Sequence, residues 1–84
     1  MEEKDIREHF LEDFCEEIED SNKYLDLSEE AEAAGMHGTA IALRMIAHEE
    51  MTHARFLHNE LEHMHAFPVE KHEKWEKLLN RFHK

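Results

Sequence analysis

The segment Ala33–Thr39, with the sequence AAGMHGT, decides the fold. Its glycines, Gly35 and Gly38, are the only two of the chain, and they are typical of a point where one helix ends and another begins. The residues on either side are rich in Glu, Leu, Ala, Lys and Met, which favour helix. We therefore expect one long helix over about residues 4–34 and a second over about 39–66, folded into an antiparallel hairpin.

A second break lies at Phe67-Pro68, because the residue before a proline is pushed out of the helical region. After it we expect a short helix over about residues 69–83. Its apolar residues would cap a bundle or join dimers; they are Trp75, Leu78, Leu79 and Phe82. Residues 1–84 thus form a single all-α domain, which is too small to be very stable without a metal or a partner.

The charge of the chain is strongly asymmetric. Residues 1–34 hold fourteen acidic and three basic side chains. Their net charge of −11 equals that of the whole chain. This pattern is unlike the basic surface of a nucleic-acid-binding protein. Cys15 is the only cysteine, so no disulfide forms within the chain, and no apolar run is long enough to span a membrane. We expect a cytoplasmic protein with no membrane or nucleic-acid partner.

Helical periodicity places three ionisable residues among the apolar ones. At 100° per residue, Glu17 lies in the apolar stripe of the first long helix, and Glu50 and His53 lie in that of the second. An ionised carboxylate on a core face costs several kcal/mol unless it is paired or bound to metal. The apolar residues that we expect in the core on these faces are Phe10, Phe14, Leu43, Ile46, Leu57 and Met64.

The Glu-x-x-His motif puts a carboxylate and an imidazole on adjacent turns of one helix face. It occurs three times here, at Glu50/His53, Glu60/His63 and Glu62/His65. Only the first pair has the register that faces the bundle. The motif alone is weak in a chain so rich in both residues, and the register selects Glu50 and His53.

Two segments resemble the rubrerythrin branch of the ferritin-like superfamily. Glu17–Tyr24, with the sequence EIEDSNKY, is similar to the first helix of that family, in which a metal-binding glutamate precedes a tyrosine by seven residues. The end of this helix at Gly35 is similar as well, and Glu49–Arg55, EEMTHAR, looks like the ligand motif of the family's second helix. The resemblance covers about residues 10–66, which is two of the usual four helices.

The resemblance implies a role for each matching residue. Glu17 would be a terminal carboxylate ligand, Glu50 a bridging carboxylate and His53 an imidazole ligand, with Tyr24 as a hydrogen-bonding group near the metals. The remaining ligands would come from the same residues of a second copy, so that a homodimer, or a higher homo-oligomer built from it, completes a four-helix bundle. Oxygen-rich ligation with some imidazole suits iron or manganese. No Cys-x-x-Cys pair is present, so turnover would need an external electron donor.

Three functions follow as alternatives. The first is an oxidoreductase that oxidises Fe(II) with peroxide or dioxygen, and the second is an iron-storage ferroxidase within a larger assembly. The third is a metal-free helical interaction module with the acidic face as its docking surface. In a metal-free bundle, Glu17, Glu50 and His53 would form a buried polar network. We expect the other histidines to be exposed to solvent. His58 and Glu62 form a His-x-x-x-Glu pair that resembles hemerythrin, but we identify no partner ligands on other helices.

Overall fold

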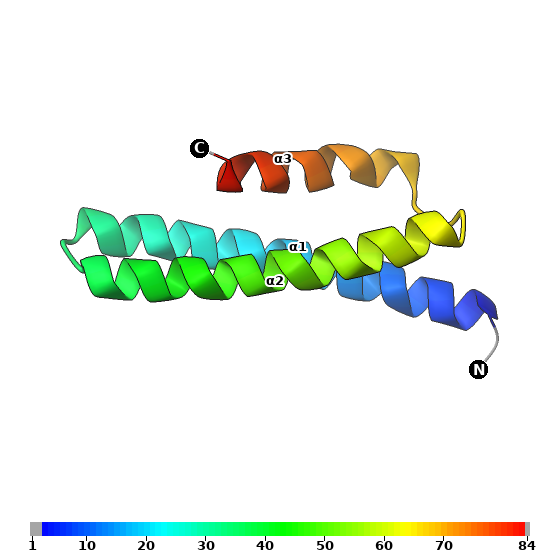
Figure 1. Cartoon of the computed structure of the whole chain (residues 1–84), viewed down its shortest axis with the longest axis horizontal. Helices are drawn as coiled ribbons and strands as arrows, with labels where there is room; N and C mark the ends of the chain where they lie inside the picture. The colour runs from blue at the N-terminus through cyan, green and yellow to red at the C-terminus, as the bar shows by residue number, and fades with distance from the viewer. Residues whose placement is uncertain (1–2, 84) are drawn as a thin grey trace.

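A long helical hairpin with a short helix packed along it makes up the molecule (Figure 1). The computed structural model describes residues 3–83, so positions 1, 2 and 84 of the expected domain lie outside the described residues. Its elements are α1 (Glu3–Ala33), α2 (His37–His63), a 3-10 turn η1 (Val69–Lys71) and α3 (His72–Phe82). The all-α prediction is confirmed for this part of the chain. None of these helices is both long and apolar enough to cross a lipid bilayer.

The turn between α1 and α2 is closed by a glycine, as the sequence predicted. Gly35 has a φ of +78°, in the left-handed region that favours glycine. The amide of Met36 donates to the carbonyl of Ala31 at 2.8 Å, and the amide of Gly35 donates to that of Glu32 at 3.0 Å. These two bonds form a Schellman motif, which satisfies the last carbonyls of α1 and reverses the chain.

The end of α2 has the same hydrogen-bond pattern without a glycine. His65 takes the left-handed conformation, with a φ of 55°, and the amide of Ala66 donates to the carbonyl of Leu61 at 2.8 Å. Because this motif ends α2 at His63, the helix is three residues shorter than the expected end at 66. The chain can therefore turn before Pro68 and return along the hairpin.

Small residues line the contact between α1 and α2. The hydroxyl of Ser21 donates to the carbonyl of Ala47 at 2.7 Å, and that of Ser28 donates to the carbonyl of Ala40 at 2.8 Å. All four residues are buried, where polar groups need hydrogen-bond partners, and these two bonds supply them for both hydroxyls and both carbonyls. Side chains this short allow the two helices to approach closely.

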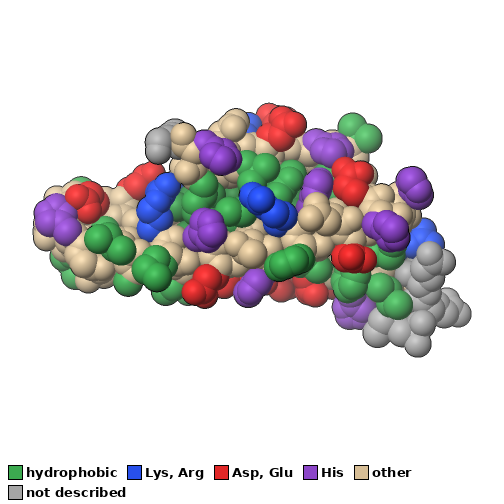
Figure 2. All heavy atoms as spheres, viewed as in Figure 1, with side chains coloured by type: hydrophobic (Ala, Val, Ile, Leu, Met, Phe, Trp, Pro, Cys, Tyr) green, Lys and Arg blue, Asp and Glu red, His purple; other side chains and the backbone are tan. Residues whose placement is uncertain are grey.

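The third helix packs on its own hairpin. It runs antiparallel to α2 (Figure 1), and hydrophobic side chains gather where it meets the hairpin (Figure 2). Trp75 and Leu78 are buried there. The core unites residues of all three helices; they are Phe14, Ile18, Leu25, Ala47, Met51, Ala54, Leu61, Trp75 and Leu78. The helix α3 therefore packs along its own hairpin, and the two expected roles, a cap on the bundle or a link between dimers, stay predictions.

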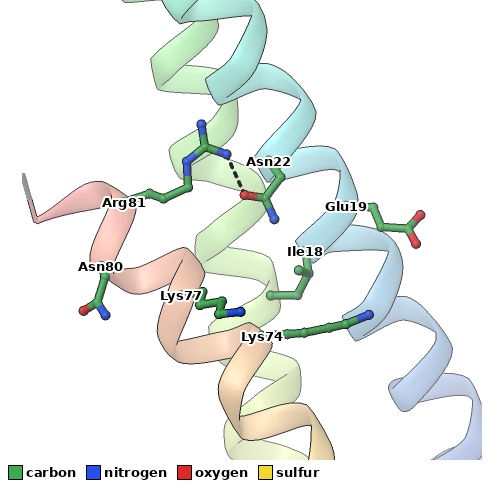
Figure 3. Close-up of a pocket in the computed structure, with 7 residues that line it drawn as sticks. All are labelled: Ile18, Glu19, Asn22, Lys74, Lys77, Asn80 and Arg81. Carbon is green, nitrogen blue, oxygen red and sulfur yellow. Dashed lines mark hydrogen bonds between the residues drawn. The ribbon is translucent and has the colours of Figure 1, made fainter.

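Arg81 connects the end of α3 to the acidic helix α1 through hydrogen bonds. Arg81 donates to Asn22 at 2.7 Å, to Asp26 at 2.9 Å and to Glu29 at 3.2 Å. Figure 3 shows Arg81 reaching Asn22 at the groove between the two helices, and Lys74 and Lys77 extend from the same helix. The opposite charges of the two ends of the chain thus complement each other, although exposed pairs of this kind contribute little each.

The packing of α3 adds residues to the core that the sequence analysis did not predict. Of the residues expected there, Phe14 is buried, whereas the side chain of Ile46 is 38% exposed. The others are only half-buried; they are Phe10, Leu43, Leu57 and Met64. The prediction did not include the folding of α3 back onto the hairpin. With α3 in place, the core also contains Ile18, Leu25 and Met51, which lie outside the predicted apolar stripes.

Candidate metal centre

Glu17, Glu50 and His53 come together in the folded chain. Each offers one ligand atom, and these atoms all lie within 4.8 Å of one another. Glu17 comes from the middle of α1, and the other two come from adjacent turns of α2. The structure thus brings together the three residues that the sequence predicted as metal ligands.

The cluster lies on the side of the hairpin opposite α3. Asn22, Asp26 and Glu29, which Arg81 of α3 contacts, lie about 120–180° from Glu17 around the axis of α1, at 3.6 residues per turn. On α2, His48 contacts Phe82 of α3 and lies about 160° from Glu50. The helix α3 therefore leaves the face that carries the cluster uncovered.

The Glu17 carboxylate is the most enclosed member of the cluster. Its side chain is 23% exposed, whereas that of His53 is 59% exposed. Its Oε2 atom is buried and accepts no hydrogen bond from any residue in 3–83. His53 Nδ1 lies 3.4 Å from this oxygen, which is longer than a normal N–H···O hydrogen bond. A buried acceptor without a donor is costly, and it indicates a position where another group can bind.

The protonation of Glu17 reflects this environment. Burial, hydrogen bonding with Glu50 and the negative charge of Glu50 raise the pKa of Glu17 from 4.5 to about 7, against the opposing effect of His53. The carboxyl group therefore holds a proton more readily than an exposed glutamate does. A divalent cation at the same position would replace that proton and relieve the repulsion between the carboxylates.

The donor set fits a hard or borderline divalent cation. Two carboxylates and one imidazole suit iron or manganese better than a thiolate-binding metal. The buried Oε2 atom of Glu17 supports this fit, because it accepts no hydrogen bond of normal geometry from residues 3–83 and lies 3.4 Å from the Nδ1 atom of His53. Three protein ligands leave room for further ligands, whether from water or from a second chain.

Tyr24 is not brought to the cluster. It lies seven residues after Glu17, which is about 10 Å along the helix axis. Its half-buried ring packs beside the core, and the Nζ atom of Lys23 lies 4.9 Å from the ring centroid. Among the described residues, the Tyr24 hydroxyl makes no hydrogen bond to Glu17, Glu50 or His53. Its role near a metal stays a prediction that rests on the family resemblance.

The other Glu-x-x-His pairs are exposed, as their register predicted; they are Glu60/His63 and Glu62/His65. The expectation that His58 lies in solvent is wrong, since its side chain is only 17% exposed. It packs against Trp75 and Phe67, and His72 brings a second imidazole to the same place. The spacing of His58 and Glu62 was visible in the sequence, but the approach of His72 depends on how α3 folds back.

Comparisons with known proteins identify no family for this chain. No family model matches the sequence, and neither a curated protein nor a solved structure matches the chain.

Proposed function

We propose that two copies of this chain pair to form a di-iron carboxylate protein that oxidises Fe(II) with peroxide or dioxygen. The observation that carries this proposal is the convergence of Glu17, Glu50 and His53 within 4.8 Å, on the hairpin face that α3 leaves uncovered. In di-iron bundles, two helices each give a glutamate and the other two each give a Glu-x-x-His motif. One hairpin here supplies half of that set, so a second copy is needed to complete it.

The uncovered face also supports pairing. It carries the exposed side chains of Leu27 and Ile46, and the half-buried Leu57 lies two turns beyond Glu50. Burying such apolar side chains against a second copy is favourable at about 25 cal/mol per Å². A two-fold axis at this face places each cluster opposite its equivalent, which gathers four carboxylates and two imidazoles.

The residues of the chain have separate tasks in this proposal. The carboxylates of Glu17 and Glu50 would bind the metal ions and neutralise part of their positive charge, and His53 would supply a nitrogen ligand. When bound, iron would supply the redox chemistry, which is the two-electron reduction of peroxide to two waters with the uptake of two protons. The enclosed position of Glu17 keeps part of the bulk solvent from the centre.

An anaerobic Fe(II) titration followed by peroxide and then by air tests the proposal. We expect two irons per dimer at this centre, a faster absorbance change with peroxide or dioxygen than in Glu17→Ala, and a melting temperature that rises with Fe(II) or Mn(II). Continued uptake of iron after oxidation would favour the storage ferroxidase instead. A monomer with no metal-dependent change in melting temperature would contradict the proposal and leave the metal-free interaction module.

A further inference from the structure

A second cluster of metal-binding side chains lies outside the centre described above. His58 and Glu62 stand one turn apart on α2, and His72 is the first residue of α3. The Nε2 atom of His58 lies 3.5 Å from Oε1 of Glu62, and the Nε2 atom of His72 lies 3.6 Å from the same oxygen. The three ligand atoms all lie within 4.8 Å of one another.

These separations fit metal ligands better than hydrogen bonds. A normal N–H···O bond is about 2.7–3.2 Å long, so both contacts with Glu62 are too long. In a tetrahedral zinc site with metal–ligand bonds of about 2.1 Å, neighbouring ligand atoms are about 3.4 Å apart. The two separations from Oε1 of Glu62, 3.5 and 3.6 Å, are close to that edge length.

The ring of His58 is held in the orientation that a ligand needs. Its Nδ1 atom lies 3.2 Å from Oδ1 of Asn59, and the tautomer that donates this hydrogen bond leaves the Nε2 lone pair towards Glu62. The ring stacks on Trp75, with centroids 5.3 Å apart and planes at 24°, and meets the edge of Phe67 at 4.6 Å. A hydrogen bond to the other ring nitrogen is usual for histidines that bind metals.

We propose that His58, Glu62 and His72 bind a divalent transition-metal ion of the zinc type. Two imidazoles and one carboxylate form a donor set found for zinc, with water in the fourth position. The side chains of Glu62 and His72 are 48% and 44% exposed, so an ion can enter and keep a water. The ion links α2 to α3 across the turn that contains Pro68, and it holds α3 against the hairpin.

The fluorescence of Trp75 provides a local test, because it is the only tryptophan of the chain. Co²⁺ bound beside His58 should quench this fluorescence, and Zn²⁺ should reverse the quenching by competition. We expect His72→Ala to weaken Co²⁺ binding by about tenfold or more. His63→Ala, which changes an exposed histidine at the end of α2, serves as the matched control and should bind Co²⁺ as the unchanged chain does.

Further variants separate this site from the di-iron centre and from a loss of folding. Glu17→Ala should leave the Trp75 quenching unchanged. If His72→Ala shifts the Trp75 emission before metal is added, then Glu62→Gln, which keeps α3 intact, must show the weaker binding. The proposal is overturned if millimolar Co²⁺ leaves the fluorescence unchanged. It is also overturned if Glu62→Gln binds Co²⁺ as tightly as the unchanged chain.

Discussion

The hydroxyl of Ser21 donates a 2.7 Å hydrogen bond to the carbonyl oxygen of Ala47, and both residues are fully shielded from solvent. Ser21 lies one turn after Glu17 on α1, and Ala47 lies one turn before Glu50 on α2. This contact therefore fixes the separation of the two helices next to the carboxylates. The distance between Glu17 and Glu50 therefore depends on a pair of residues outside the cluster itself.

Enlarging Ser21 should disturb both stability and metal binding. We expect Ser21→Ala to cost about 1 kcal/mol, because it removes one buried hydrogen bond and keeps the small size. Ser21→Leu should cost about 1–3 kcal/mol more through overpacking, and should also weaken Mn(II) binding. Urea denaturation and Mn(II) titration by electron paramagnetic resonance measure the two effects. Equal Mn(II) affinity in the two variants would show that the helix separation does not control the centre.

Replacing Glu50 should affect metal binding more than replacing a glutamate outside the cluster. We expect Glu50→Ala to weaken Mn(II) binding by more than about tenfold, since a direct ligand is lost. Glu60→Ala is the matched control, because this glutamate lies on the same helix and is exposed. Mn(II) suits this comparison because it prefers oxygen ligands. The same Mn(II) occupancy in both variants would exclude Glu50 as a ligand.

The raised pKa of Glu17 predicts a dependence of apo-protein stability on pH. Between pH 4.5 and about 7, the folded state keeps a proton that the unfolded state loses, so this group's contribution to the unfolding free energy falls as the pH rises. Glu17→Gln removes the effect. We expect the unfolding free energy of Glu17→Gln, relative to that of the unchanged chain, to be higher at pH 8 than at pH 5. The difference should be on the order of 1–2 kcal/mol, with partial solvent screening included.

Urea denaturation of the metal-free proteins at the two pH values measures this difference. Glu16→Gln is the control, since Glu16 is the exposed neighbour of Glu17. If Glu17→Gln and Glu16→Gln change stability equally at both pH values, the burial of Glu17 has no energetic consequence.

A charge on the uncovered face should prevent pairing without unfolding the chain. We expect Ile46→Lys to give a monomer, because a lysine in an apolar interface must lose its hydration. Ile41→Lys introduces the same charge at another exposed position of α2, about 140° away around the helix, and should leave the dimer intact. Sedimentation equilibrium and circular dichroism distinguish dissociation from unfolding. Dimers of equal stability in both variants would place the interface elsewhere.

The sequence predicted the features that depend on local rules. Gly35 indicated the turn because only a glycine takes a φ of +78° without strain, and the 100° periodicity brought Glu17, Glu50 and His53 to one side of the hairpin. The register of α1 against α2 could not be predicted in the same way. It depends on Ser21 and Ser28, whose hydroxyls bond to carbonyls that any residue would offer.

The position of α3 was beyond prediction because it depends on contacts between distant parts of the chain. Arg81 meets Asn22 and Asp26 more than fifty residues away, and Trp75 fits between Phe14 and His58. The end of α2 also involves a residue without a clear signal, since His65 takes a conformation that usually requires glycine. The absence of Ile18, Leu25 and Met51 from the predicted core and the missed approach of His72 to Glu62 both follow from this fold-back.

The placement of α3 on one face of the hairpin limits the number of copies that the proposed assembly can contain. Because α3 covers one face of each hairpin, the proposed pairing buries the opposite face of both copies. A two-fold contact of this kind is closed, in that neither partner keeps a free half-site to offer to a third chain. In this proposal α3 limits assembly, because without it each hairpin would keep a second apolar face on which further copies could add.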